Sequence, residues 1–261
     1  MFKKISKLFV VLVVISLGFI YTEKAIYLVR EYDPIMKSIK EVEDNFYIEA
    51  KPAYIEQDMY IPGVNGLEIN LNKSYLNMKK NGIYDESLLV FSHINSNNYD
   101  NSKYISKTNQ TKKEVSIIIQ LDNNFYLNKL ITLLNNKNIK VNFFVKEDTI
   151  SSKDLSLIKS YGHHINYYTD KINVNTVGQY CLYKEKNTQL LEYCSDNKKI
   201  SLLPSIIGGN ILFTKVKANL EYGSVILIDN LSNLNQISIT IDFIKQKGLV
   251  INLLEQTLNI K

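Results

Sequence analysis

The sequence predicts an α/β fold built on a parallel sheet, because strand-like and helix-like segments alternate through about the last 150 residues. The clearest alternation begins with a β-branched apolar run at 115–121. A segment with apolar residues at helical spacing follows at 127–134, and then a second apolar run at 140–145. Parallel strands joined through helices require right-handed crossovers. This order predicts either a β/α barrel or an open α/β sheet.

A helix-start signal and a helix-stop signal bound the next element. Ser151 lies three residues before Asp154, as in a capping box, and Gly162 suits the left-handed conformation that ends many helices. A third extended run follows at 163–168. Further along the chain, the same alternation predicts strands at 179–183, 200–207, 224–228 and 249–253 and helices at 187–194, 213–220 and 234–247.

The first 111 residues have a different organisation. Residues 1–24 carry three lysines before an apolar run, which predicts an uncleaved signal anchor with its N-terminus in the cytoplasm. A cleaved secretory signal and a buried core helix are the alternatives. The sequence then predicts a helical stalk at 25–46, a small N-terminal region and linker at 47–111, and the α/β domain at 112–261. We therefore expect a single-pass protein of the cell membrane whose C-terminal domain is extracytoplasmic.

The charge pattern argues against nucleic acid as a partner. The formal net charge is +5 over 261 residues, and apart from the N-terminal cluster the lysines are scattered. A nucleic-acid surface needs clustered Lys and Arg with interleaved aromatic residues, and the sequence has no such cluster.

Cys181 and Cys194 are too few for a disulfide framework. Cys181 lies in a strand-like run and Cys194 at the end of a helix-like run. In a β-α-β unit the end of the helix returns close to the start of the next strand, so the two cysteines can approach each other. They form either a disulfide or two small buried apolar side chains, and the sequence leaves both alternatives open.

Five motifs in series resemble the polysaccharide deacetylase family, also called the NodB homology domain. They are IQLDNN at 119–124, VNFFV at 141–145, GHHINYY at 162–168, GSVILIDN at 223–230 and KQKGLVINLLEQ at 245–256. Their order and spacing carry the resemblance, which covers about residues 112–261. It implies a distorted (β/α) barrel and a metal-dependent N- or O-deacetylase that acts on cell-wall or related glycans.

The resemblance also implies roles for single residues. In the family an Asp-His-His site holds a metal that polarises the acetyl carbonyl and activates a water. Here Asp122 falls on the position of the catalytic base, and Asp229 on that of the acid histidine. The three metal-ligand positions carry Asn123, Tyr168 and Ile172. The implied metal site is therefore degenerate, and we expect no cofactor unless that site still binds a divalent metal of the zinc type.

Histidines and tyrosines are the candidates for contacting a substrate. His163, His164 and Tyr168 are predicted to bind the glycan, although adjacent strand residues point to opposite faces, so both histidines cannot line one site. A partly buried or rim histidine is the alternative. Surface tyrosines, among them Tyr161, Tyr167, Tyr168 and Tyr183, are expected to stack on sugars unless they belong to the core.

Three functions follow from these observations. The first is a membrane-anchored deacetylase-like protein of the cell envelope that has lost catalysis and binds cell-wall glycan or an envelope protein. The second is an active carbohydrate deacetylase with a non-standard site formed by Asp122 and Asp229, both of which follow predicted strand ends. The third is a structural envelope protein whose groove is filled by side chains such as Ile172 and Leu203.

Overall fold

The computed structural model describes residues 18, 21–22, 24–146, 149–172 and 178–258. Within these ranges the chain forms two compact units. The smaller unit takes its residues from 1–50 and 66–94, and the larger from 51–65 and 95–261. The boundary falls inside the stretch 47–111 that the sequence assigned to one small region, because two parts of that stretch pack with the α/β domain.

Among the described residues, the smaller unit contains α-helices, a short 3-10 helix and one pair of antiparallel strands. Its elements are α2 (Pro34–Phe46), β3 (Gly66–Ile69), α3 (Leu71–Lys79), the short 3-10 helix η1 (Glu86–Leu88) and β4 (Phe91–Ile94), with β3 and β4 antiparallel. Asp33 caps α2 by accepting a hydrogen bond from the Ile35 N–H at 3.0 Å, and Pro34 occupies the first turn, where it removes no helical hydrogen bond. Ile35, Ile39 and Met78 form the core of this unit.

No described helix has the length and apolar character needed to cross a membrane. The anchor predicted at 1–24 lies mostly outside the described residues. Residues 24–32 are helical, and α2 follows them after a break at Asp33.

The larger unit is built on an eight-stranded sheet in which every pairing is parallel. The strands are β5 (Glu114–Leu121), β6 (Asn142–Val145), β7 (His164–Thr169), β8 (Tyr180–Leu182), β9 (Ile200–Leu202), β10 (Ile206–Ile207), β11 (Val225–Ile228) and β12 (Val250–Ile251). Their order is β10-β11-β5-β6-β7-β8-β9, with β12 beside the start of β5. The predicted alternation of strands and helices is thereby confirmed.

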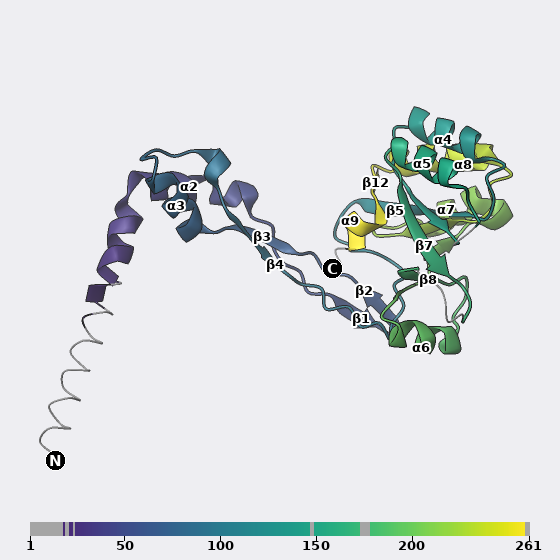
Figure 1. Cartoon of the computed structure of the whole chain (residues 1–261), viewed down its shortest axis with the longest axis horizontal. Coiled ribbons are helices and arrows are strands. Elements are labelled where there is room, and N and C mark those ends of the chain that lie inside the picture. The colour runs from purple at the N-terminus through teal and green to yellow at the C-terminus, as the bar shows by residue number, and fades with distance from the viewer. Residues whose placement is uncertain (1–17, 19–20, 23, 147–148, 173–177, 259–261) are drawn as a thin grey trace, which may run out of the picture. The chain divides into compact units, whose positions relative to one another are not determined.

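The helices of this unit are α4 (Leu127–Asn136), α5 (Ser152–Ser160), α6 (Thr188–Asp196), α7 (Leu212–Asn219), α8 (Leu234–Gln246) and α9 (Leu254–Leu258). Helices α4, α5 and α8 gather along one side of the sheet (Figure 1). Successive residues of β5 serve two cores, because side chains alternate across a strand. Ile117 and Ile119 pack with α4, α7 and α8, whereas Ile118 packs on the other face with Leu254 and Leu258 of α9.

Among the described residues the sheet is a partial barrel that does not close into a ring, so the distorted (β/α) barrel that the resemblance implied is confirmed in part. The predicted strand at 200–207 is broken into β9 and β10, because Pro204 has no N–H for a ladder hydrogen bond. Residues 105–108 lie beside this break. Ile105 N–H donates to the Ser201 carbonyl at 2.7 Å, and Thr108 N–H donates to the Gly223 carbonyl at 2.7 Å. A segment predicted as linker thus connects β9 with the start of β11.

The C-terminal end of the described chain also differs from its prediction. The strand predicted at 249–253 is limited to β12, and α9 follows it. Asn142 anchors this helix, because its side-chain oxygen accepts the Leu254 N–H at 2.8 Å. Glu255 accepts hydrogen bonds from the side chains of Asn142 at 2.7 Å and Asn166 at 2.8 Å.

Candidate functional site

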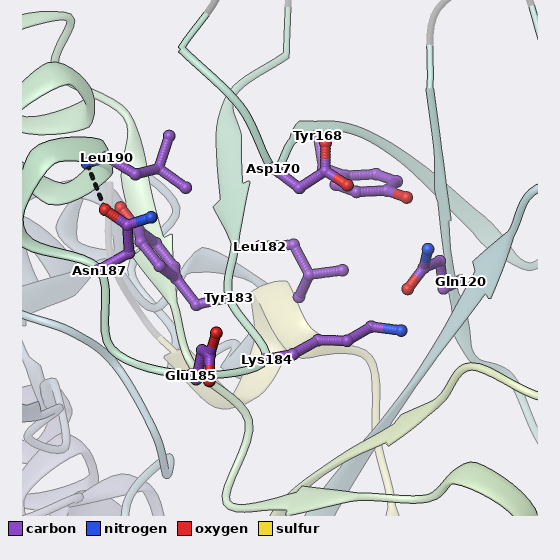
Figure 2. A pocket seen from close by; sticks show the side chains of 9 residues that line it. All are labelled: Gln120, Tyr168, Asp170, Leu182, Tyr183, Lys184, Glu185, Asn187 and Leu190. Atoms are coloured by element: carbon purple, nitrogen blue, oxygen red, sulfur yellow. Dashed lines mark hydrogen bonds between the residues drawn. The ribbon is translucent and has the colours of Figure 1, made fainter.

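A cavity of about 200 Å³ lies where β5, β7 and β8 end. Its walls are Gln120, Tyr168, Asp170, Leu182, Tyr183, Lys184, Glu185, Asn187 and Leu190. Gln120, Tyr168 and the apolar side chains are buried, whereas Asp170, Lys184, Glu185 and Asn187 form an exposed rim. Figure 2 shows Gln120, Tyr168, Leu182 and Lys184 converging on the same space. The carboxyl ends of parallel strands are where open α/β sheets bind ligands, so this cavity is the candidate site.

Asp122 is held by two side chains beside the cavity. The amide nitrogen of Gln120 lies 3.1 Å from each oxygen of the Asp122 carboxylate, and the Tyr168 hydroxyl lies 3.4 Å from Oδ1. Burial, followed by the negative charge of Asp122, raises the pKa of Tyr168 far above its ordinary value. Tyr168 is therefore a neutral phenol whose hydroxyl donates a hydrogen bond to Asp122.

Gln120 leaves one hydrogen-bonding atom unused. Its Oε1 is buried and has no partner among the described residues, and the side chain as a whole is only 8% exposed. The orientation of the amide follows from chemistry, because a carboxylate only accepts hydrogen bonds and the Gln120 nitrogen must therefore face Asp122. The oxygen then points into the cavity, as Figure 2 shows.

Asp229 has a separate set of partners. Lys184 Nζ lies 2.7 Å from its Oδ2, and the Gly209 N–H donates to its Oδ1 at 2.8 Å. Burial by itself raises the pKa of Asp229, but Lys184 and the Gly209 N–H outweigh burial and keep this pKa below its ordinary value. Asp122 and Asp229 follow the neighbouring strands β5 and β11, yet they share no hydrogen-bond partner among the residues that the structure describes. Their joint catalytic role stays a prediction.

The residues at the family's metal positions do not fit a metal ion. Asn123 Oδ1 accepts the Phe125 N–H at 3.1 Å and so closes a local turn. Tyr168 is a protonated phenol, and Ile172 is an aliphatic side chain that is 57% exposed. Across the described ranges there is no group of three or more His, Cys, Asp or Glu that could hold a metal. We derive no catalytic step through a metal for this site.

Ile172 and Leu203 do not line the cavity. Asp122 and Asp229 do not line it either, so the filled groove of the structural hypothesis stays a prediction.

His163 and His164 lie at the opposite end of β7 from Tyr168. His163 is buried against Phe143, and its Nδ1 accepts the Val141 N–H at 3.3 Å. Burial, with a smaller effect of Lys140, lowers the pKa of His163 to about 4. His164 is exposed and lies 3.3 Å from Glu255. The structure does not bring either histidine to the cavity, and their predicted binding of glycan stays a prediction.

The tyrosines expected at the surface divide into two groups. Tyr161 and Tyr167 are exposed, whereas Tyr168 and Tyr183 are buried. The expectation that all four present their rings to solvent needs correction, because Tyr168 and Tyr183 each belong to a buried core cluster. Tyr183 instead lines the cavity and packs edge to face on Tyr104, and burial raises its pKa to about 12.

A disulfide between Cys181 and Cys194 fixes one wall of the cavity. Cys181 belongs to β8 and Cys194 to α6, and their Cα atoms are 6.4 Å apart. The loop between β8 and α6 carries Lys184, Glu185 and Asn187 of the rim. The disulfide alternative that the sequence left open is the one that the structure shows.

The cavity residues that sequence reasoning missed include Gln120, Lys184, Glu185 and Asn187. Gln120 had a signal, since it is a polar residue at the end of an otherwise apolar buried strand. The other three lie in a charged loop, and nothing in their spacing distinguishes this loop from other surface loops.

Comparisons with known proteins identify the fold. No protein-family model matches the chain. The uncharacterized protein YlxY of Bacillus subtilis (strain 168) is 28% identical over 145 residues, which are 52% of this chain and 45% of YlxY. The chain therefore matches less than half the length of this relative.

Solved structures extend the comparison to most of the chain. A CE4 family pseudoenzyme from Bacillus anthracis is 15% identical with a TM-score of 0.59, covering 87% of this chain and 95% of its own. A mutant of this pseudoenzyme with restored enzymatic activity has the same identity and TM-score, covering 87% of this chain and 98% of its own. A peptidoglycan N-acetylglucosamine deacetylase is 17% identical with a TM-score of 0.53, covering 60% of this chain and 94% of its own. The chain has the fold of the CE4 polysaccharide deacetylases, as its motifs predicted.

Proposed function

We propose that this protein is a membrane-anchored, extracytoplasmic deacetylase-like protein of the cell envelope that binds cell-wall glycan and has lost metal-dependent deacetylation. The observation that carries the proposal is the arrangement of Gln120, Asp122 and Tyr168. The carboxylate at the position of the family's base is hydrogen-bonded by an amide and a neutral phenol, and that phenol stands at a metal-ligand position.

Loss of the metal removes the main source of catalysis for this reaction class. A divalent ion supplies several kcal/mol by polarising the carbonyl and by producing a nucleophilic hydroxide near neutral pH. A neutral phenol, a turn-forming amide and an aliphatic side chain supply none of this. Asp122 could accept a proton from a water, but without an ion the developing oxyanion has no stabilising charge at the family's position.

Two features support binding rather than a purely structural role. The cavity is open at a rim of polar side chains, and its floor holds an unpartnered hydrogen-bond acceptor. A buried polar atom without a partner destabilises a fold by about 1–3 kcal/mol, and a bound ligand can supply the missing hydrogen bond. A protein with only a structural role would gain stability by filling this space.

The disulfide supports the proposed location. Disulfides persist in oxidising compartments outside the cytoplasm and are rare within it. The basic and apolar N-terminal sequence is consistent with an anchor that places the rest of the chain on that side.

Two measurements on the full chain in detergent test the loss of catalysis. We expect no stoichiometric zinc or cobalt after purification, and no release of acetate from acetylated peptidoglycan fragments above that of Asp122→Ala. Stoichiometric metal with turnover that Asp122→Ala abolishes would show instead that the protein is an active deacetylase with a non-standard site.

Co-sedimentation with purified peptidoglycan tests the binding. Glu185→Trp places a bulky side chain on the exposed rim, and we expect it to abolish binding. Glu192→Trp is the matched control on α6, away from the cavity. A chain that fails to sediment with peptidoglycan contradicts glycan binding, and the envelope protein then remains as the partner to search for.

A further inference from the structure

We infer that the cavity selects an amino sugar whose nitrogen is free, that is, a de-N-acetylated residue of the glycan, over its N-acetylated form. This inference rests on the proposed glycan binding and names the chemical group that the cavity recognises. The preferred ligand is a product of deacetylation, because it has already lost its acetyl group.

The floor of the cavity requires a hydrogen-bond donor. Gln120 Oε1 is buried without a partner, and the contact of the amide nitrogen with Asp122 fixes the oxygen toward the cavity. Tyr168 offers no competing donor, because its proton is directed at Asp122. A ligand therefore gains most by presenting an N–H or O–H group at this point.

The rim makes a cationic donor preferable to a neutral one. Glu185 has no ion-pair or hydrogen-bond partner among the described residues, and it lies at the mouth of the cavity. Lys184 is the only cation of the lining among those residues, and Asp229 at 2.7 Å neutralises it. Asp170 is neutralised in turn by Lys146 at 2.8 Å. With Asp122 also close to Gln120, the uncompensated charges around the cavity are negative.

The shape of the cavity limits the ligand to a small group or a single ring. Its volume of about 200 Å³ is below the range of about 300–1,000 Å³ typical of pockets for drug-sized molecules. Leu182, Leu190 and Tyr183 give one wall an apolar surface, against which the face of a sugar ring can pack. The amino group can then reach Gln120 while the rest of the chain of sugars extends past the rim.

An N-acetyl group fits this chemistry less well. It replaces an ammonium, which has several donors and a positive charge, with one N–H, and it adds a carbonyl oxygen that needs a donor. Gln120 Oε1 and Glu185 are both acceptors, so they repel that oxygen. Lys184 and Asn187 are the donors of the lining, and Asp229 already accepts one of the three hydrogen bonds that the Lys184 ammonium can donate.

Isothermal titration calorimetry of the full chain with two tetrasaccharides tests the inference. The probes are a tetramer of glucosamine and a tetramer of N-acetylglucosamine. We expect the glucosamine tetramer to bind at least about tenfold more tightly, since a hydrogen bond to a charged group contributes at least this factor. Equal affinity, or tighter binding of the acetylated tetramer, would overturn the inference.

Matched variants separate recognition in the cavity from general attraction of a polycation. Glu185→Gln should remove most of the preference, while Glu192→Gln, which deletes the same charge on α6 outside the cavity, should leave it unchanged. Gln120→Leu should also remove it, with thermal unfolding as the check that the variant folds. If both Glu→Gln variants behave alike, the inference fails.

The outcomes also distinguish this inference from the proposed function. Glycan binding that Glu185→Trp abolishes, together with a preference for the glucosamine tetramer that Glu185→Gln leaves unchanged, would retain the proposed function and overturn the role of Glu185 in selecting an amine. Binding of neither tetramer, together with no co-sedimentation with peptidoglycan, would overturn both.

Discussion

The hydroxyl of Tyr168 lies 3.4 Å from the carboxylate of Asp122. The two residues end different strands, and in the family that the sequence resembles their positions belong to a metal ligand and to the catalytic base. We predict that the backbone of such a site is preserved, while the side chains that would hold the metal are replaced. This arrangement leads to the first of four predictions.

Restoring the missing ligands should restore metal binding. We expect the triple variant Asn123→Asp, Tyr168→His, Ile172→His to purify with, or to take up, one zinc ion per chain, as measured by elemental analysis. Lys146 Nζ lies 5.6 Å from the centre of the Tyr168 ring and pairs with Asp170, so replacing Lys146 both removes a positive charge near the metal position and frees a carboxylate. Adding Lys146→Met to the triple variant should therefore raise zinc affinity. A triple variant that folds and binds no zinc would show that the backbone no longer matches the geometry of a metal site.

Removing the disulfide should lower the free energy of unfolding. Cys181 and Cys194 are separated by 13 residues, and closing a loop of this size in the unfolded chain stabilises the fold by about 3 kcal/mol. We expect the double variant Cys181→Ala, Cys194→Ala to lose about this amount in urea unfolding followed by circular dichroism. Adding a reductant should destabilise the unmodified protein to a similar extent and leave the double variant unchanged. Equal stability with and without reductant would contradict a role for the disulfide.

His163 should make the fold less stable in mild acid. Its pKa is about 4 when folded, against 6.5 for an unperturbed histidine, because burial disfavours the charged ring. Its folded pKa is depressed, so the unfolded chain takes up a proton first as the pH falls below 6.5. Because the unfolded chain binds this proton and the folded chain does not, the free energy of unfolding falls as the pH drops from 6.5 to about 4, by about 3 kcal/mol in total.

Urea unfolding across this pH window checks the effect of His163. We expect His163→Phe to lose less stability than the unmodified protein between pH 6.5 and about pH 4. The lost hydrogen bond to the Val141 N–H lowers stability by an amount that does not depend on pH. His93→Gln is the control, because the side chain of His93 is exposed. Parallel curves for His163→Phe and the unmodified protein would rule out this histidine as the source.

Glu255 should hold the C-terminal helix in place. Its carboxylate accepts from Asn142 and Asn166 and lies 3.3 Å from His164. Hydrogen bonds to a charged group contribute more than neutral ones, and Glu255 is about a third exposed, so we expect Glu255→Ala to cost about 2 kcal/mol. Hydrogen exchange should show faster opening of α9 and of the start of β6. Glu192→Ala, an exposed carboxylate on α6, should change neither measurement.

Periodicity and cap signals predicted most of the larger unit. Ser151 caps α5 by accepting the Asp154 N–H, and Gly162 has a positive φ of 76°, as its place after the helix required. These elements were predictable because their signals are local. Helix α9 was not, since residues 249–258 have an apolar pattern that suits either a strand or a helix, and the docking of Leu254 on Asn142 decides between them.

The candidate site was predictable only in part, because only its local signals can be recognised in the sequence. The positions of Asp122 and Tyr168 were predictable because each residue lies at the end of a strand that belongs to the series of motifs. The partners of Asp229 come from a loop and a glycine that are distant in sequence, and tertiary folding alone brings them together. The histidines lie far from the cavity because they stand at the start of β7, whereas the cavity is at its end. His163 and Tyr168 are five positions apart along one extended segment.

Residues 105–108 determine where a fragment of the chain can begin if it is to fold. A fragment that starts at residue 112 would lack the N–H groups of Ile105 and Thr108, which pair with the carbonyls of Ser201 and Gly223. It would expose the edge of β9 and uncover apolar side chains that Ile105 now shields from water. Exposed strand edges of this kind recruit other chains and cause aggregation. An expression boundary placed at the first sequence motif would therefore give an insoluble product, whereas one that keeps residues 51–65 and 95–111 retains the whole larger unit.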